Sequence, residues 1–309
     1  MRRRRRPLDA PAREAIGRVL GDPVFEVLPL ASGRAQVRFL PPAAIVSVTS
    51  SPSRGLAATV AFASELAAGG FRVVPHIAAR MVRDRAELRD IVARLADAGI
   101  GRLFVPAGDA REPGEFPDGL SLLRALAELD HPFREIGVPC YPQGHPFIPD
   151  DRLLAALAAK AEFATFMTTQ LCFDPEAIDH WILARRGDGL ALPINIGLPG
   201  VAPLARLISL SARIGVGDSA RFLGQNRGLV GRLLRPRGFR PDDLLADLAP
   251  TLESPPAGVL TIHLYTFNQV ATTEAWRQRY LDRLGPGSVR VQPGAPPVAI
   301  DSRRDSGGK

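Results

Sequence analysis

Short apolar runs alternate with longer amphipathic runs along most of the chain. Val24–Leu28 and Ile45–Thr49 are rich in β-branched residues and too short for helices, which is typical of buried strands. Residues 55–68 form an alanine-rich run that stops at a pair of glycines, as helices do. Residues 84–98 begin at an aspartate that can cap a helix and stop at Gly99. The pattern predicts repeated units of one strand and one helix.

The same reading extends over the whole chain and gives eight strands. They are expected at residues 24–28, 45–49, 71–77, 102–106, 134–141, 163–170, 190–197 and 258–265. Helices are expected at residues 55–68, 84–98, 118–129, 149–161, 175–186, 203–214, 218–227, 235–248 and 272–284. Eight such units close a parallel barrel, so we expect an α/β protein with the (β/α)8 TIM barrel fold. An open doubly wound sheet gives the same alternation, but no Gly-x-Gly-x-x-Gly motif of its dinucleotide-binding version follows the first strand.

The chain is expected to form a single catalytic domain over residues 21–285. A basic arm and a lead-in helix, residues 1–20, come before it, and residues 286–309 are rich in Pro, Gly and Ser without periodicity, which predicts a disordered tail. No apolar run approaches the length of a membrane span, and no apolar stretch follows the N-terminal arginines as in a secretory signal. We therefore expect a cytoplasmic protein with no membrane partner, and a homo-oligomer is compatible with the sequence.

The charge of the chain is concentrated at its ends. The formal net charge is +7, of which Arg2 to Arg6 supply five charges and residues 286–309 two, so the body is close to neutral. A nucleic-acid enzyme would carry basic charge on its folded face, so no nucleic-acid partner is expected and the arginines are interpreted as a solvated arm. Binding of nucleic acid through this arm stays a separate hypothesis, and it predicts that deleting the arm abolishes the main activity.

Polar residues recur where the predicted strands end. Because the carboxyl ends of barrel strands converge on one mouth, residues placed there are candidates for chemistry. Glu26 is the most informative, since an acid within Val-Phe-Glu-Val-Leu is rarely buried without a partner, and it is a candidate proton donor. The others are Thr49, His76, Gly108, Asp109, Tyr141, His145, Gln170, Tyr265 and Asn268.

Other reaction classes find little support. The histidines are scattered without the paired spacing of a metal site, so no metal is expected. No Gly-x-Ser-x-Gly elbow and no phosphate-binding Gly-Lys-Ser/Thr motif is present. Cys140 and Cys172 lie outside recognisable nucleophile motifs, and buried free thiols are expected rather than a disulfide.

Taken in order, these segments resemble the methylenetetrahydrofolate reductases over residues 24–284. Short motifs of that family, each weak alone, follow one another with sensible spacing. They are Phe25-Glu26-Val-Leu-Pro29, Val46-Ser-Val-Thr49, Pro75-His76, Gly108-Asp109, Tyr141-Pro-Gln-Gly-His145-Pro146, Lys160 on a helix, Thr169-Gln170-Leu-Cys-Phe-Asp174 and Leu264-Tyr265-Thr266-Phe-Asn268.

The resemblance implies an enzyme that reduces 5,10-methylenetetrahydrofolate to 5-methyltetrahydrofolate with NADH or NADPH through bound FAD. Glu26 would be the general acid that protonates the departing nitrogen of the folate. Asp109, Gln170 and Gln269 would bind the folate. The FAD site would be lined by Thr49, His76, Gly108, Asp109, Tyr141, His145 and Lys160.

The chain departs from the family pattern at three positions. Ala107 stands where the family has arginine before Gly-Asp, Gln269 stands where it has arginine after Leu-Asn, and Gln143 replaces a glutamate. Glutamine cannot replace the charge or the bidentate donors of arginine. These changes leave three alternatives open: another flavin or direct hydride transfer from NADH, a folate-dependent methyl transferase or demethylase, and a non-catalytic relative that binds folate or flavin.

Overall fold

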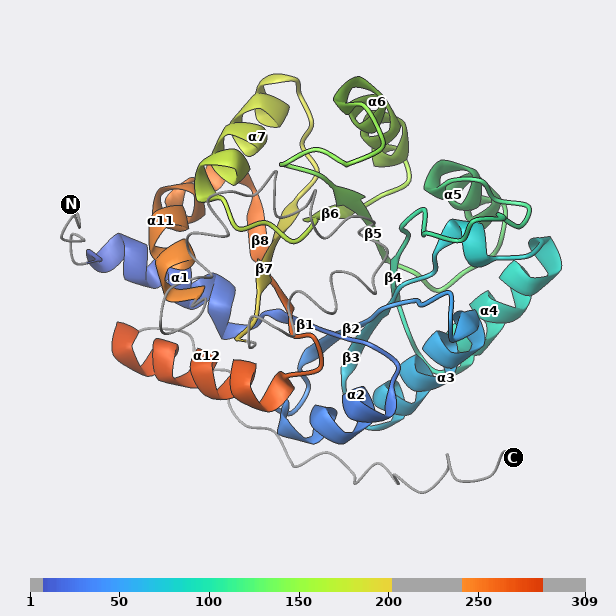
Figure 1. The fold of residues 1–309 in the computed structure, drawn as a ribbon, viewed down its shortest axis with the longest axis horizontal. Coiled ribbons are helices and arrows are strands. Elements are labelled where there is room, and N and C mark those ends of the chain that lie inside the picture. The colour runs from blue at the N-terminus through green and yellow to red at the C-terminus, as the bar shows by residue number, and fades with distance from the viewer. Residues whose placement is uncertain (1–7, 202–240, 286–309) are drawn as a thin grey trace.

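Eight parallel strands form a ring that helices surround in the computed structural model of the chain (Figure 1). The structure describes residues 8–201 and 241–285. The basic arm, the helices expected at residues 203–214 and 218–227, and the expected disordered tail lie outside these described residues.

The strands follow one another around the ring in chain order. Their order in the sheet is β3-β2-β1-β8-β7-β6-β5-β4, and every described pairing is parallel. A bridge between His76 and Phe104, with a 2.9 Å hydrogen bond from the Ile77 N–H to the Phe104 carbonyl, joins β3 to β4. The predicted (β/α)8 barrel is therefore confirmed. The strands are β1 (Val24–Val27), β2 (Ile45–Val48), β3 (Arg72–Pro75), β4 (Arg102–Phe104), β5 (Glu135–Cys140), β6 (Phe166–Thr169), β7 (Ile194–Pro199) and β8 (Val259–Tyr265).

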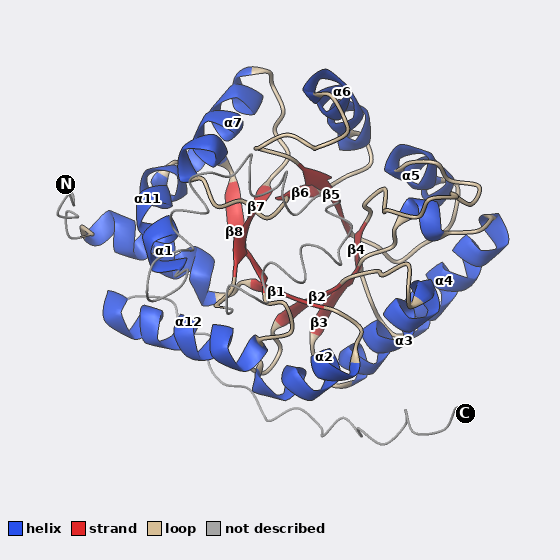
Figure 2. Cartoon of the chain, viewed as in Figure 1, coloured by secondary structure: helices blue, strands red, loops and turns tan. Residues whose placement is uncertain are grey.

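The helices form an outer layer around the strands (Figure 2). The described α-helices are α1 (Ala10–Gly21), α2 (Ala31–Gln36), α3 (Gly55–Ala68), α4 (Arg85–Asp97), α5 (Gly119–Ala127), α6 (Asp150–Ala161), α7 (Pro175–Gly187), α11 (Pro241–Glu253) and α12 (Val270–Leu284). Short 3₁₀ turns lie at η1 (Val37–Phe39), η2 (Ala79–Met81) and η3 (Pro255–Ala257). In the described residues no helix has the length and apolar character needed to cross a membrane.

Aspartate caps fix where three of the helices begin. The Asp84 carboxylate accepts a 2.8 Å hydrogen bond from the Glu87 N–H, which confirms the predicted cap. Asp118 caps α5 reciprocally with Ser121, and Asp174 accepts from two N–H groups in the first turn of α7. Each cap satisfies backbone donors that a helix leaves free at its N-terminus. The loops that precede these helices therefore have defined ends.

The described residues form two hydrophobic cores because strand side chains alternate between the two faces of the barrel wall. The larger core lies between the strands and the helices. A smaller one lies inside the barrel near the first residues of the strands and consists of Val24, Ile45, Val74, Phe104 and Phe166. Gly137 completes this inner layer, since a Cβ there would lie 2.3 Å from the Phe166 ring and 2.8 Å from the Phe104 ring.

Some predicted boundaries were wrong because helix ends extend into the expected strands. Strand β6 begins at Phe166 rather than at residue 163, since the N–H groups of Phe163 and Ala164 still bond to the Lys160 carbonyl. Strand β7 begins at Ile194 rather than at residue 190, since the Leu190 N–H closes the end of α7 on Arg185.

Three helical segments also differ from the prediction. Helix α11 is described over Pro241–Glu253, so it ends five residues later than the expected 248, while residues 235–240 of the expected helix lie outside the described residues. Helix α2 was not predicted, because Ala31–Gln36 is short and contains Ser and Gly. Helix α1 packs on the barrel through Ile16, Val19 and Leu20, so the expected lead-in helix is part of the barrel body.

Candidate active site

Glu26 lies inside the barrel near the carboxyl end of β1. Its side chain shares the inward face with Val24, two positions earlier, and only 8% of the residue is exposed. Its Oε2 atom lies 3.1 Å from Nε2 of His263 on the neighbouring strand β8. A hydrogen bond between these two atoms requires a proton between them, so the pair holds a transferable proton.

Two further polar pairs occupy the barrel interior. Ser47 Oγ lies 2.6 Å from His76 Nε2, and the Asn195 amide donates a 3.4 Å hydrogen bond to Thr168 Oγ1. All four residues are buried. Burial lowers the pKa of His76 to about 4, although the charge of Glu26 acts in the opposite direction. At neutral pH His76 is therefore uncharged.

Two tyrosines connect the Glu26 pair to the opposite side of the barrel mouth. The Tyr265 hydroxyl donates a 3.1 Å hydrogen bond to the Thr169 carbonyl. Burial raises the pKa of Tyr265 well above its usual value, and the negative charge of Glu26 and the neighbouring Tyr141 add to this. Burial likewise raises the pKa of Tyr141 to about 12, with a smaller contribution from the charge of Asp109. Electrostatic interactions thus link Glu26 to Tyr265, Tyr265 to Tyr141, and Tyr141 to Asp109.

Asp109 belongs to a polar cluster at the ends of β4 and β5. Partial burial of the Asp109 carboxyl group raises its pKa, and the positive charges of His145 and Arg80 oppose this rise. Loss of solvent lowers the pKa of His145, which the charge of Asp109 opposes. The Tyr141 and His145 rings meet edge to face with centroids 5.4 Å apart. The structure therefore brings Asp109, Tyr141 and His145 together.

Gly108 fixes the course of the loop that carries Asp109. Its φ of 85° lies in the left-handed region, and a Cβ there would come within 2.7 Å of the Ala78 Cβ. Arg80 on η2 holds the same loop, because its guanidinium donates to the carbonyls of Ala110, Arg111 and Pro117 at 2.8, 3.0 and 3.1 Å. Sequence reasoning did not single out Arg80, since nothing local to it marks a loop 30 residues further along the chain.

Thr49 is the candidate cofactor residue with an unused hydrogen-bonding group. Its Oγ1 atom is buried and has no hydrogen-bond partner among the described residues. Buried polar atoms in proteins are nearly always paired. This hydroxyl is thus available to a bound molecule.

Gln170 and Gln269 occupy the mouth differently. The exposed Gln170 follows β6, its N–H bonds to the Cys140 carbonyl, and its Oε1 accepts 2.8 Å from the Leu171 N–H. Its Oε1 atom is therefore engaged locally, whereas its Nε2 atom has no hydrogen-bond partner among the described residues. Gln269 precedes α12 and donates through Nε2 to the Asn268 carbonyl at 3.1 Å, so its amide is engaged locally.

Lys160 lies beside the start of α5 and the end of β5. Burial lowers its pKa, and the groups that oppose this are the Cys140 thiol and the Asp118 carboxylate, which caps α5. Its Cδ atom would lie 3.7 Å from a Cβ on Gly119, in the first turn of α5. These contacts place the side chain between α6, on which it lies, and the first turn of α5.

His263 and Ser47 lie in the barrel interior but were not among the site residues predicted from the sequence. Each lies two positions from a residue that was recognised as polar at a strand end: His263 before Tyr265 and Ser47 before Thr49. Alternation along a strand puts such pairs on one face. That spacing is the signal that could have found them.

The described residues offer little to metal or thiol chemistry. No group of three or more His, Cys, Asp or Glu side chains in residues 8–201 and 241–285 is arranged to hold a metal ion. Cys140 and Cys172 are buried and unpaired, as expected. Burial raises the pKa of both thiols, which disfavours the thiolate that a nucleophile needs.

Comparison with known proteins gives a family match and several distant structural likenesses, among them two proteins from Burkholderia cenocepacia J2315. A lyase/mutase from Burkholderia cenocepacia J2315 is 16% identical with a TM-score of 0.43, over 89% of this chain and 86% of that one. A phosphonomutase from the same organism is 14% identical with a TM-score of 0.42, over 88% of this chain and 100% of that one. Likenesses at this level carry no information about function. The family model described as methylenetetrahydrofolate reductase matches residues 37–217, more than half of the 309 residues. The chain therefore belongs to the methylenetetrahydrofolate reductase family.

Proposed function

We propose that this protein reduces 5,10-methylenetetrahydrofolate to 5-methyltetrahydrofolate with NADH or NADPH, through bound FAD. The observation that carries the proposal is the buried Glu26–His263 pair, which holds a proton near the carboxyl ends of β1 and β8. Glu26 lies before the segment that the family model matches, so its geometry supports the reaction independently of that match.

Glu26 acts as the general acid in this reaction. The carboxyl group protonates the departing nitrogen of the imidazolidine ring, the ring opens, and the one-carbon unit becomes an electrophilic iminium carbon. Glu26 is buried, and a positioned acid of this kind accelerates a reaction by about 10²- to 10⁴-fold.

The chain offers suitable residues for a flavin at the mouth of the barrel. The unpartnered Thr49 hydroxyl, the close backbone approach at Gly108 and the Asp109, Tyr141 and His145 cluster would hold it. When bound, FAD supplies the hydride chemistry, and the protein supplies orientation and electrostatics. Lys160, which the resemblance assigns to the same site, would add a positive charge beside Cys140 and Asp118.

Asp109 and Gln170 position the folate. The carboxyl group of Asp109 can bond the polar edge of the pterin. Because burial already raises its pKa, a bound ring that removes more solvent would raise this pKa further. Gln170 is exposed at the end of β6, where its Nε2 can donate to the same substrate. His76, which is uncharged at neutral pH, adds no positive charge beside Glu26 and His263.

A spectrum of the purified protein tests the proposal. We expect flavin absorption that NADH or NADPH bleaches without oxygen, and methylenetetrahydrofolate should restore the colour while 5-methyltetrahydrofolate appears by mass spectrometry. A protein that binds FAD but leaves it oxidised in the presence of both nucleotides would exclude this function.

The local bonding of Gln269 favours one second candidate. Because its amide is tied to Asn268, it is less available to the substrate than an arginine would be. A folate-dependent methyl transferase or demethylase on the same barrel fits this change. It predicts a colourless protein that moves a methyl group between a folate and an acceptor without NAD(P)H.

A further inference from the structure

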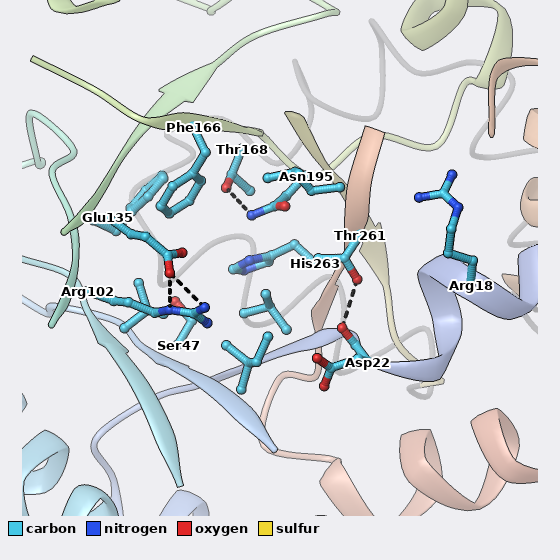
Figure 3. Close-up of a pocket in the computed structure, with 15 residues that line it drawn as sticks. Arg18, Asp22, Ser47, Arg102, Glu135, Phe166, Thr168, Asn195, Thr261 and His263 are labelled. Carbon is cyan, nitrogen blue, oxygen red and sulfur yellow. Dashed lines mark hydrogen bonds and ion pairs between the residues drawn. The ribbon is translucent and has the colours of Figure 1, made fainter. Parts of the chain in front are cut away.

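A cavity of about 280 Å³ lies inside the barrel on the side opposite to the mouth (Figure 3). Val24, Ile45, Arg102, Glu135 and Phe166 line it, and each is the first residue of its strand. The cavity therefore opens at the amino ends of the strands, away from the family site.

The cavity changes character from its rim to its inner end. The rim carries the ion pair between Arg102 and Glu135, whose side chains are 28% and 46% exposed, so the rim contacts solvent. The middle is the apolar inner core, and the inner end is polar, with Ser47, Thr168, Asn195 and His263. Figure 3 shows the His263 ring projecting into this space beside the Asn195–Thr168 bond.

The inner end has features of a site that holds water. Asn195 is 5% exposed, lines the cavity, and its Oδ1 atom has no hydrogen-bond partner among the described residues. Cavities that are polar and larger than about 30 Å³ are usually hydrated, whereas apolar cavities stay dry. Hydration would satisfy the Asn195 oxygen and bring water to His263.

His263 separates this cavity from Glu26. The histidine lines the cavity, whereas Glu26 is not among its lining residues, and the two side chains are bonded at 3.1 Å. A path therefore leads from solvent at the amino ends of the strands, past an apolar ring, to the proton-holding pair.

We propose that this cavity is a proton supply route and that His263 relays protons from its water to Glu26. The inference rests on the function proposed above, in which Glu26 loses one proton to the folate nitrogen in each turnover. As Nε2 of His263 passes its proton to Oε2 of the Glu26 carboxylate, Nδ1 of the same ring takes a proton from water in the cavity, and solvent replaces the proton that this water gives up. Exchange of the ring proton through cavity water then returns it to Nε2 before the next turnover. One proton enters from solvent for each proton delivered to substrate, and no electrons move.

The route explains how Glu26 regains its proton while substrate and flavin cover the mouth. Protonation from the mouth would need the folate to leave first. Supply through the barrel interior removes that requirement and keeps water away from the hydride acceptor. His263 is then a positioning and relay residue, since it acts on substrate through Glu26.

The existence of the route can be tested without turnover. In protein labelled with ¹⁵N-histidine, we expect the His263 ring N–H to exchange with water about tenfold more slowly in Val74→Trp, whose indole would fill the cavity. Val74→Thr has nearly the size of valine and leaves the space open, so its exchange should match the wild type. Ile45→Phe provides a second filled variant should the tryptophan prevent folding. Equal exchange in filled and open variants would overturn the route.

The use of the route is tested by chemical rescue. His263→Ala should reduce flavin with NAD(P)H normally but reduce folate about 100-fold more slowly, and imidazole, which is smaller than the cavity, should restore much of the loss. The combination of His263→Ala with Val74→Trp should not respond to imidazole, and exposed His180→Gln on α7 serves as control. Normal folate reduction in His263→Ala, or a loss that imidazole cannot rescue, would overturn the relay. Failure of the wild type to reduce folate would instead refute the proposed function, and the exchange experiment would still decide whether the route exists.

Discussion

Individual interior side chains in this barrel are held in defined protonation states by burial. His76 is the best example, because burial lowers its pKa to about 4 while its ring bonds to Ser47. The polar character of such residues can be predicted from the sequence, but their partners cannot. Glu26 and His263 are 237 positions apart, and only closure of the ring between β1 and β8 brings them together.

His76 predicts a specific loss of stability in acid. The unfolded chain protonates this histidine near pH 6.5, whereas the folded protein does so only near pH 4. Its contribution is fully present above pH 6.5 and is lost as the pH falls towards 4, by about 3 kcal/mol. Urea unfolding at pH 7 and pH 4 should therefore show a smaller loss in His76→Gln than in the wild type. Identical losses in the two proteins would contradict the lowered pKa.

Gly108 and Gly189 form a matched pair for testing the Asp109 loop. Both have positive φ, at 85° and 83°, but only Gly108 has a close neighbour at the position of a Cβ. Either alanine substitution costs about 1–2 kcal/mol for the left-handed conformation. Gly108→Ala should cost more in urea unfolding and should weaken FAD binding in a fluorescence titration, whereas Gly189→Ala should leave FAD binding unchanged. Equal effects of both substitutions would show that the contact with Ala78 does not shape the site.

Helices and strands were predictable where their ends carry a chemical signal. The Asp84 cap and the glycine after residue 98 gave α4 to within one residue at each end. The starts of β6 and β7 were missed because the preceding helix ends use residues 163, 164 and 190 for their own hydrogen bonds. Helix α2 has no such signal, and its formation depends on contact with the barrel.

A buried ion pair within α12 holds Arg277 against the end of α1. Arg277 is 2% exposed, bonds Glu274 at 2.7 and 2.8 Å, and donates to the carbonyls of Leu20 and Gly21 at the end of α1. Arg277→Met removes the charged partner of the buried Glu274 carboxylate, which keeps the hydrogen bond from the Gln278 amide, and should cost about 3–5 kcal/mol in urea unfolding. Arg283→Met, which breaks an exposed pair with Asp242, should cost less than about 1 kcal/mol. Similar costs for the two variants would show that the buried pair does not hold the helices together.

For the whole molecule, the eightfold alternation predicted the units of strand and helix, and the missing dinucleotide-binding motif favoured a closed barrel over an open sheet. The cavity at the amino ends of the strands could not be predicted, because it depends on which small side chains meet inside the ring. Val24 and Val74 leave space there only because β1 and β3 face one axis.

The basic arm predicts a behaviour of the whole chain that is separate from its catalysis. Deleting residues 2–6 lowers the formal net charge from +7 to +2. We expect the shortened protein to elute earlier from heparin, since its binding to polyanions is electrostatic, while its turnover stays within about twofold of the full chain. A loss of turnover on deletion would favour a nucleic-acid function for the arm.

The central claim is that Glu26 donates the proton in folate reduction. Glu26→Gln preserves the size of the side chain and its contact with His263 but removes the transferable proton. We measure both half-reactions in this variant by stopped flow, with the exposed Glu162→Gln on the other side of the wall as control. The account predicts unchanged flavin reduction by NAD(P)H and reoxidation by methylenetetrahydrofolate that is slower by about 10²- to 10⁴-fold. Reoxidation at the wild-type rate in Glu26→Gln would contradict it.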